Sequence, residues 1–237
     1  MNILIAADSF KDALPALEVC TAIAKGLRQA NPAIQPQLFP MADGGEGTAD
    51  ILTFHNNGQQ MQCTVLDPLG RPVEATYGIS QDGQTAFMEM AQASGIQLLT
   101  EAERNPLLAS TYGTGQLIAH ALERGIRKIV LGIGGSATND MGMGMLRALG
   151  YRFWDASAKE LAGTGADLTK VTQFEESKRN EGLQDLELTI ICDVDNPLYG
   201  PNGAAHVYGQ QKGATPEMIQ QLDMGLRQFA TIIETQK

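Results

Sequence analysis

Apolar and polar residues alternate in blocks over the first 60 residues of the chain. A short apolar run over residues 2–7 predicts a strand, and the apolar residues between Leu17 and Leu27 recur at the spacing of one helix face. Residues 35–54 repeat this order of strand, loop and helix. Strands that alternate with helices in this way predict a parallel sheet with crossover helices.

The pattern changes near residue 60. Residues 60–80 alternate between apolar and polar on both sides of the turn-rich sequence DPLGRP, which predicts an antiparallel hairpin. The later predicted elements are a strand and short helix over residues 85–96, a helix and buried strand over residues 110–135, a buried strand over residues 186–192 and a C-terminal amphipathic helix. Thr114 is the expected N-cap of the helix that follows residue 110. The C-terminal helix is expected to start at Thr215, with Pro216 in its first position.

Composition and charge narrow the classes of function. The formal net charge of −10 argues against nucleic acid or an anionic membrane surface as a partner, because both require a basic face. The apolar runs are too short to cross a bilayer and the N-terminus lacks the features of a secretory signal, so we expect a cytoplasmic protein. The three cysteines have no metal-binding spacing and are expected to be small core residues.

Four predicted strands end in small, polar and acidic residues. The segments are AADSFK (6–11), MADGGEGT (41–48), GIGGSATND (132–140) and CDVDNPLYGPNG (192–203). Ligands of open parallel sheets bind at the carboxyl ends of the strands. If these strands are neighbours, the four loops form one crevice.

The third of these loops has the composition of an anion cradle. Glycines at 134 and 135 allow backbone N–H groups to approach a phosphate, and a helix beginning at Ser136 or Thr138 would add the partial positive charge of its N-terminus. The alternative is a tight turn in which the glycines only permit positive φ angles. No Walker A lysine motif is present, so the loop does not match that nucleotide-binding pattern.

Two more features can carry chemistry. Asp193 and Asp195 lie two residues apart, so an extended backbone places both carboxylates on one face, where they can hold Mg²⁺ or take up a proton. Alternatively, they satisfy backbone donors in a turn. Lys11, just after Asp8 and Ser9, is well placed for a carboxylate or phosphate, although most lysines are solvated surface residues.

Five segments in order along the chain resemble the signature segments of the bacterial glycerate kinase family: DSFK, MADGGEGT, YGTGQLI, GIGGSATND and CDVDNPLYGPNGAA. The resemblance implies ATP-dependent phosphorylation of D-glycerate, usually at the 2-hydroxyl. It also implies an α/β fold in which a mixed α/β domain is inserted into a Rossmann-like parallel sheet domain. We therefore predict residues 1–59 as the first part of the Rossmann-like domain and residues 60–237 as the inserted domain.

The chain departs from the family pattern at three places. Asp12, Ala13 and Pro15 stand where the family has Gly, Ser and Ser, and NDMGMGM replaces a run richer in glycine and alanine. The resemblance also implies a longer chain, with a further glycine-rich segment of the PGAGAAGG type beyond residue 237. The rest of the C-terminal region of the family is therefore expected to be absent.

A phosphoryl transfer to an alcohol needs a base, a cation and an anion cradle. We predict Asp193, Lys11 and Asp43 as catalytic residues, with Asp193 as the base, and Asp140 and Asp195 as ligands of Mg²⁺. The predicted substrate- or phosphate-binding residues are Asp8, Ser9, Gly44, Gly45, Gly134, Gly135, Ser136, Asn139 and Asn196. A phosphatase, an isomerase, or an impaired chain that binds glycerate or nucleotide without turnover are the alternatives.

Overall fold

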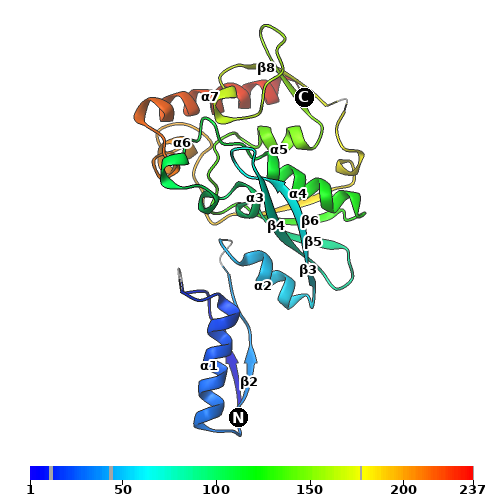
Figure 1. Ribbon diagram of the computed structural model, residues 1–237, viewed down its shortest axis with the longest axis vertical. Coiled ribbons are helices and arrows are strands. Elements are labelled where there is room, and N and C mark those ends of the chain that lie inside the picture. Colours follow the sequence, from blue (N-terminus) through cyan, green and yellow to red (C-terminus); the bar gives the residue numbers. More distant parts are fainter. Residues whose placement is uncertain (11–12, 43–44, 177, 237) are drawn as a thin grey trace.

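A computed structural model of the chain describes residues 1–10, 13–42, 45–176 and 178–236. At one end, β1 (Asn2–Ile5), α1 (Ala16–Ala30) and β2 (Gln35–Leu38) form a unit in which the two strands pair in parallel. This N-terminal unit extends away from the rest of the molecule, and α2 (Thr48–His55) lies between the two parts (Figure 1). The first crossover predicted from the sequence is therefore confirmed.

The rest of the chain is built on a mixed sheet of order β3-β4-β5-β6-β9. Its strands are β3 (Gln59–Leu66), β4 (Pro72–Ile79), β5 (Thr85–Glu89), β6 (Lys128–Gly132) and β9 (Glu187–Ile191). The strands β3 and β4 pair antiparallel, as the hairpin pattern predicts, and β4 also pairs antiparallel with β5. The strands β5, β6 and β9 run parallel to one another. The carboxyl ends of these three parallel strands therefore lie at one edge of the sheet.

Helices and two further strands complete the architecture. They are α3 (Ala91–Ser94), α4 (Tyr112–Glu123), α5 (Met143–Ala148), β7 (Arg152–Asp155), β8 (Val171–Glu175), α6 (Ala204–Tyr208) and α7 (Pro216–Gln236). The strands β7 and β8 form a separate antiparallel pair. None of the helices in the described ranges combines the length and the apolar character needed to span a bilayer.

The central sheet is covered on both faces at β5. Ala86 and Met88 point toward α4, where they pack in the main core with Leu117 and Ile118. Glu89 has the opposite orientation because side chains alternate along a strand, and its carboxylate contacts the start of α2. Because one face of β5 packs against α4 and the other contacts α2, four of its five residues are buried.

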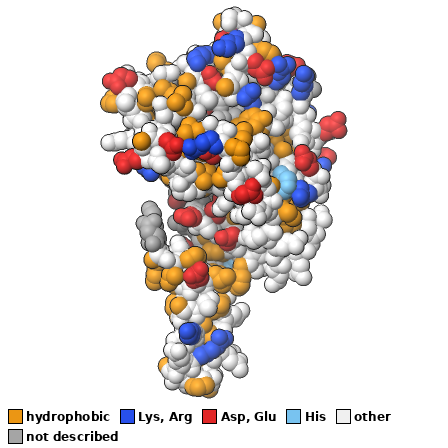
Figure 2. Space-filling view, viewed as in Figure 1, with side chains coloured by type: hydrophobic (Ala, Val, Ile, Leu, Met, Phe, Trp, Pro, Cys, Tyr) orange, Lys and Arg blue, Asp and Glu red, His pale blue; other side chains and the backbone are white. Residues whose placement is uncertain are grey.

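Two further cores differ greatly in size. One joins α7 to β7 and β8, with Phe153, Leu226 and Phe229 fully enclosed. The core of the N-terminal unit contains only Ile5, Cys20 and Ala24 as buried residues. Several large apolar side chains of this unit are exposed, and acidic side chains lie around the waist where the unit joins the rest (Figure 2).

Three local predictions are corrected by the structure. The strand expected to be buried near Leu186 is the edge strand β9, most of whose residues are exposed, and the adjoining Cys192 is exposed as well. The helix α4 follows Thr111, so Thr114 lies inside the first turn and bonds the Ser94 hydroxyl at 2.7 Å instead of capping. The final helix begins at Pro216, as the sequence predicts.

Candidate functional site

Two of the four polar loops meet at one edge of the central sheet. Glu89, Gly132 and Ile191 are register partners at the carboxyl ends of β5, β6 and β9, so the segments 133–140 and 192–196 emerge side by side. The loops at 6–10 and 39–42 emerge together from the N-terminal unit, where the Met41 N–H donates to the Ala7 carbonyl at 2.9 Å. Figure 1 shows that β1 and β2 point toward the rest of the molecule.

The loop after β6 runs as an extended segment beside residues 94–96. The Ile96 N–H donates to the Gly135 carbonyl at 2.9 Å, and the Ala137 N–H donates to the Ser94 carbonyl at 2.8 Å. Gly135 has a φ of +69°, a conformation that favours glycine. Among the described residues, no acceptor receives a hydrogen bond from the N–H groups of Gly134, Gly135 or Ser136. Successive N–H groups at such a turn can bind an anion.

The prediction of a helix at Ser136 or Thr138 is wrong. The helix α5 begins at Met143, after Gly142, whose φ is +72°. The intervening residues stay extended or turned because Asp140 draws the chain toward α4. The loop therefore has its own backbone donors but no helix dipole of the kind that the sequence suggests.

Asn139 is the predicted binding residue with the clearest signal in the structure. It is only 7% exposed, yet its side-chain amide makes no hydrogen bond to any described residue. The neighbouring Thr138 hydroxyl is likewise without a partner among them. Neither group is among the buried side-chain atoms that lack a partner, so both are accessible to water and can donate to or accept from a ligand.

Asp140 holds the loop by hydrogen bonds. Its carboxylate is 1% exposed and accepts four hydrogen bonds, from the Thr111 N–H and hydroxyl at 2.8 Å each, from Gly142 N–H at 3.1 Å and from Gly144 N–H at 3.2 Å. A carboxylate offers about four lone-pair sites. Three of these bonds fall on Oδ2 and one on Oδ1, and that Asp140 ligates Mg²⁺ stays a prediction.

Lys212 is a residue of this region that sequence reasoning missed. It lies in a short 3₁₀ turn after α6, is 8% exposed, and its Nζ donates to the Ser136 hydroxyl at 2.8 Å and to the Thr138 carbonyl at 2.6 Å. Burial lowers the pKa of this ammonium to about 8, and the charge of Asp140 opposes that shift. No local motif marks Lys212, because its partners lie more than 70 residues away in the sequence.

Asp193 and Asp195 follow β9 as exposed residues. Asn196 lies deeper, where its side-chain oxygen accepts from the Tyr208 hydroxyl at 2.5 Å and its amide donates to the Asn202 carbonyl at 3.2 Å. In the described ranges no group of three or more His, Cys, Asp or Glu side chains is arranged to hold a metal ion. Two exposed carboxylates nevertheless suit Mg²⁺, which keeps several waters and often shares substrate phosphates.

The loops of the N-terminal unit are described only in part. Asp8 and Ser9 are exposed, and the Ser9 N–H donates to the Asp8 carboxylate at 2.6 Å. Gly45 is half-buried and its carbonyl accepts from the Thr48 hydroxyl at 2.8 Å. The predicted residues Lys11, Asp43 and Gly44 lie outside the described residues.

Glu89 is a second residue that the sequence analysis missed, although a lone carboxylate at the end of an apolar strand is a usable signal. It is buried, and its Oε1 accepts from the Ala49 N–H at 2.8 Å, with a further bond from the Gly47 backbone. Burial raises the pKa of Glu89, and the donors of the α2 N-terminus partly offset this effect. Glu89 thus joins loop 45–48 to the edge of the central sheet.

The Glu89→Gln variant should show the cost of this buried charge. A pKa raised in the folded state means that the folded protein binds the proton more strongly, so stability falls as pH rises through the folded pKa. We expect this decline above pH 4.5 to be smaller in Glu89→Gln than in the wild type. Urea unfolding at several pH values measures it, with the exposed Glu123→Gln as control. Equal pH slopes for Glu89→Gln and the wild type would contradict the assignment.

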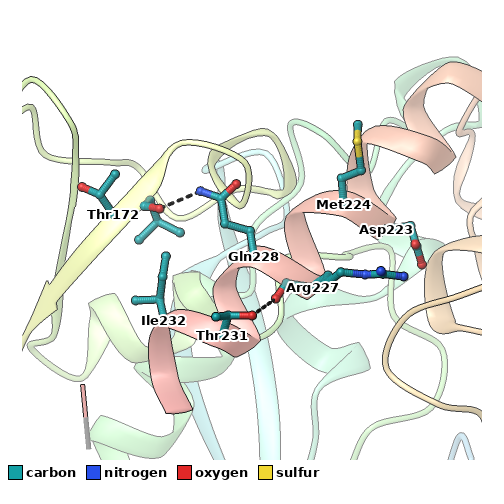
Figure 3. A pocket seen from close by; sticks show the side chains of 8 residues that line it. Thr172, Asp223, Met224, Arg227, Gln228, Thr231 and Ile232 are labelled. Carbon is teal, nitrogen blue, oxygen red and sulfur yellow. Dashed lines mark hydrogen bonds between the residues drawn. The ribbon is translucent and has the colours of Figure 1, made fainter. Parts of the chain in front are cut away.

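A separate groove of about 740 Å³ lies between α7 and β8. Figure 3 shows Arg227, Gln228 and Thr231 projecting from α7 along it. The Gln228 amide donates to the Val171 carbonyl at 2.9 Å, which ties α7 to β8. None of the predicted site residues lines this groove, so we do not count it as part of the candidate site.

The chain is similar in sequence to several glycerate kinases. The chain is 47% identical over 234 residues to a glycerate kinase of Haemophilus influenzae, covering 99% of this chain and 62% of that protein. It is 45% identical to the glycerate 2-kinase of Escherichia coli K12, covering 99% of this chain and 61% of that protein. The chain thus spans about three fifths of the length of these relatives.

A solved structure gives the same result. The crystal structure of a Salmonella typhimurium LT2 protein described as a glycerate kinase 2 superposes with a TM-score of 0.91 at 46% identity, covering 98% of this chain and 63% of that chain. The α/β fold class predicted from the sequence is confirmed by this match. The sequence model of the Glycerate kinase family matches residues 3–237. The chain therefore belongs to the glycerate kinase family.

Proposed function

We propose that this chain carries the substrate-binding edge of an enzyme that phosphorylates D-glycerate at its 2-hydroxyl with ATP. The names of the relatives support glycerate as the acceptor and a small molecule as the class of substrate. The division into residues 1–59 of a Rossmann-like domain and residues 60–237 of an inserted domain is part of the same proposal. ATP as the donor follows from the kinase class.

One observation supports the anion site in particular. The loop at 134–139 combines three backbone N–H groups that have no acceptor among the described residues with the unpartnered amide of Asn139, and a buried ammonium lies behind it. A chain of net charge −10 needs such a local set of donors to hold an anionic ligand. We propose that this loop binds an oxyanion of the substrates.

The chemical step assigns roles to the loops on either side. Asp193 accepts the proton of the glycerate hydroxyl as the new oxygen–phosphorus bond forms and the bond from the γ-phosphorus to the bridging oxygen breaks, which releases ADP. Asp140 and Asp195 are the proposed ligands of Mg²⁺, which would neutralise phosphate charge when it is bound. The proposed contacts from the other loops are Asp8, Ser9, Lys11, Asp43, Gly44, Gly45 and Asn196.

An assay of ADP release tests the proposal directly. The 237-residue chain is incubated with MgATP and D-glycerate, and ADP is followed by coupled oxidation of NADH. We expect ADP release that depends on glycerate, with 2-phosphoglycerate as the product by NMR. Because an isomerase or a phosphatase would need no ATP, product without ATP would contradict the kinase proposal. Ligand binding without any ADP release would favour a binding role.

A further inference from the structure

The buried ammonium of Lys212 has no counter-ion in the described part of the chain. Its Nζ is bonded only to a hydroxyl and a carbonyl, and no carboxylate lies within 4 Å of it among the described residues. The carboxylate whose charge acts on Lys212, Asp140, accepts hydrogen bonds from four neutral donors. An uncompensated buried charge is costly, and a bound anion nearby would offset that cost.

Hydrogen-bond chemistry then fixes the direction of the Ser136 hydroxyl. An ammonium group has donors only, so Ser136 Oγ must accept the bond from Lys212. The hydrogen of Ser136 therefore points away from Lys212 and is free to donate to another group. The bond from the cation also polarises this hydroxyl, and charge-assisted hydrogen bonds are stronger than neutral ones.

Lys212 also determines the shape of the loop. Its second bond goes to the Thr138 carbonyl, two residues beyond Ser136, so one ammonium braces both ends of the segment that presents Ser136 and leads into Asn139. The backbone supports this placement, because Gly213 is left-handed at φ +86° and a Cβ there would lie 2.2 Å from the Arg104 carbonyl oxygen.

We infer that Lys212 is a positioning residue of the proposed site, which turns the Ser136 hydroxyl and the 134–139 loop into a charge-assisted receptor for an oxyanion. The oxyanion is either the carboxylate of glycerate or a phosphate of the nucleotide. This inference rests on the proposed function. It adds a positive charge to the anion site, because residues 134–139 themselves contain no lysine or arginine. Lys212 acts through Ser136 and Thr138, and need not touch the ligand itself.

A double-mutant cycle in ligand affinity tests the inference. Lys212→Met, Ser136→Ala and the double variant are titrated calorimetrically with D-glycerate alone and with MgADP alone. We expect Lys212→Met to weaken one of the two ligands by 10-fold or more, on the order expected for loss of a charged hydrogen bond. Ser136→Ala should weaken the same ligand, and the double variant should be little worse than Lys212→Met. If D-glycerate is the weakened ligand, the site binds its carboxylate; if MgADP is weakened, the site binds a phosphate of the nucleotide.

Controls separate binding from folding and from the proposed function. Lys128→Met removes an exposed lysine from the opposite end of β6 and should leave both affinities unchanged. A purely structural Lys212 would lower the thermal midpoint while the folded fraction binds normally, and this result would overturn the inference alone. Additive effects of the two substitutions would also overturn it. If Lys212→Met does not fold, Ser136→Ala must still weaken binding.

A wild type that binds neither ligand would overturn the proposed function and the inference with it.

Discussion

The Asp193→Asn variant is expected to lose phosphoryl transfer by about 10²- to 10⁴-fold, the usual contribution of a positioned general base. Asp193 is the first acidic residue after β9, whose carboxyl end adjoins the 133–140 loop through the register of Gly132 with Ile191. Asparagine has nearly the same size but cannot accept the hydroxyl proton. Because Asp193 is exposed, the fold should be unaffected.

The measurement is the rate of ADP release at saturating MgATP and D-glycerate, with thermal melting as a check on folding. Asp185→Asn is the matched control, because it alters another exposed aspartate just before the amino end of β9. This control should retain normal turnover. Turnover within a few-fold of the wild type in Asp193→Asn would remove this carboxylate from the proposed mechanism.

The Asp140→Ala variant should be among the most destabilised single variants of the chain. Its carboxylate joins the residue before α4, Thr111, to Gly142 before α5 and to Gly144 in the first turn of α5. Truncation leaves four donors without their acceptor in a buried place, and each such group costs about 1–3 kcal/mol. Some of them will find water, so we expect a loss of about 3–5 kcal/mol in the free energy of unfolding.

Urea unfolding followed by the fluorescence of Trp154, the single tryptophan, measures this loss. Thr111→Val is the graded comparison, because it removes the hydroxyl that donates to Asp140 and accepts from the Met145 N–H, but keeps the carboxylate and the Thr111 backbone donor. It should cost about 1–2 kcal/mol. A cost below 1 kcal/mol for Asp140→Ala would show that the network is not the main support of the loop.

Much of the fold could be predicted from local pattern. The hairpin β3–β4 follows from strict alternation around DPLGRP, and the buried face of α4 follows from the spacing of Leu117, Ile118, Ala121 and Leu122. The exposure of β9 could not be predicted, because an apolar strand at the edge of a sheet has the same composition as one in its centre.

The candidate site was predictable where its residues are local in sequence. The small and polar residues of 134–139 do emerge at the carboxyl end of a parallel strand. The helix was misplaced because an acidic residue 29 positions from Thr111 in the sequence sets where the chain turns. Lys212 was missed for the same reason, since its partners lie more than 70 residues away and no spacing rule links them. Glu89 could have been noticed as a lone carboxylate at the end of an apolar strand, but its partner on α2 lies 40 residues away.

The close approach of α4 and α5 has a consequence for how the site can vary. A Cβ on Gly115 would lie 2.3 Å from the Met145 carbonyl oxygen, so any larger residue there must push α5 outward. Because α5 is continuous with the turn at Gly142, such a displacement would travel into the anion loop without altering one of its side chains. A substitution at position 115 would therefore alter the shape of the anion loop although residue 115 lies outside it.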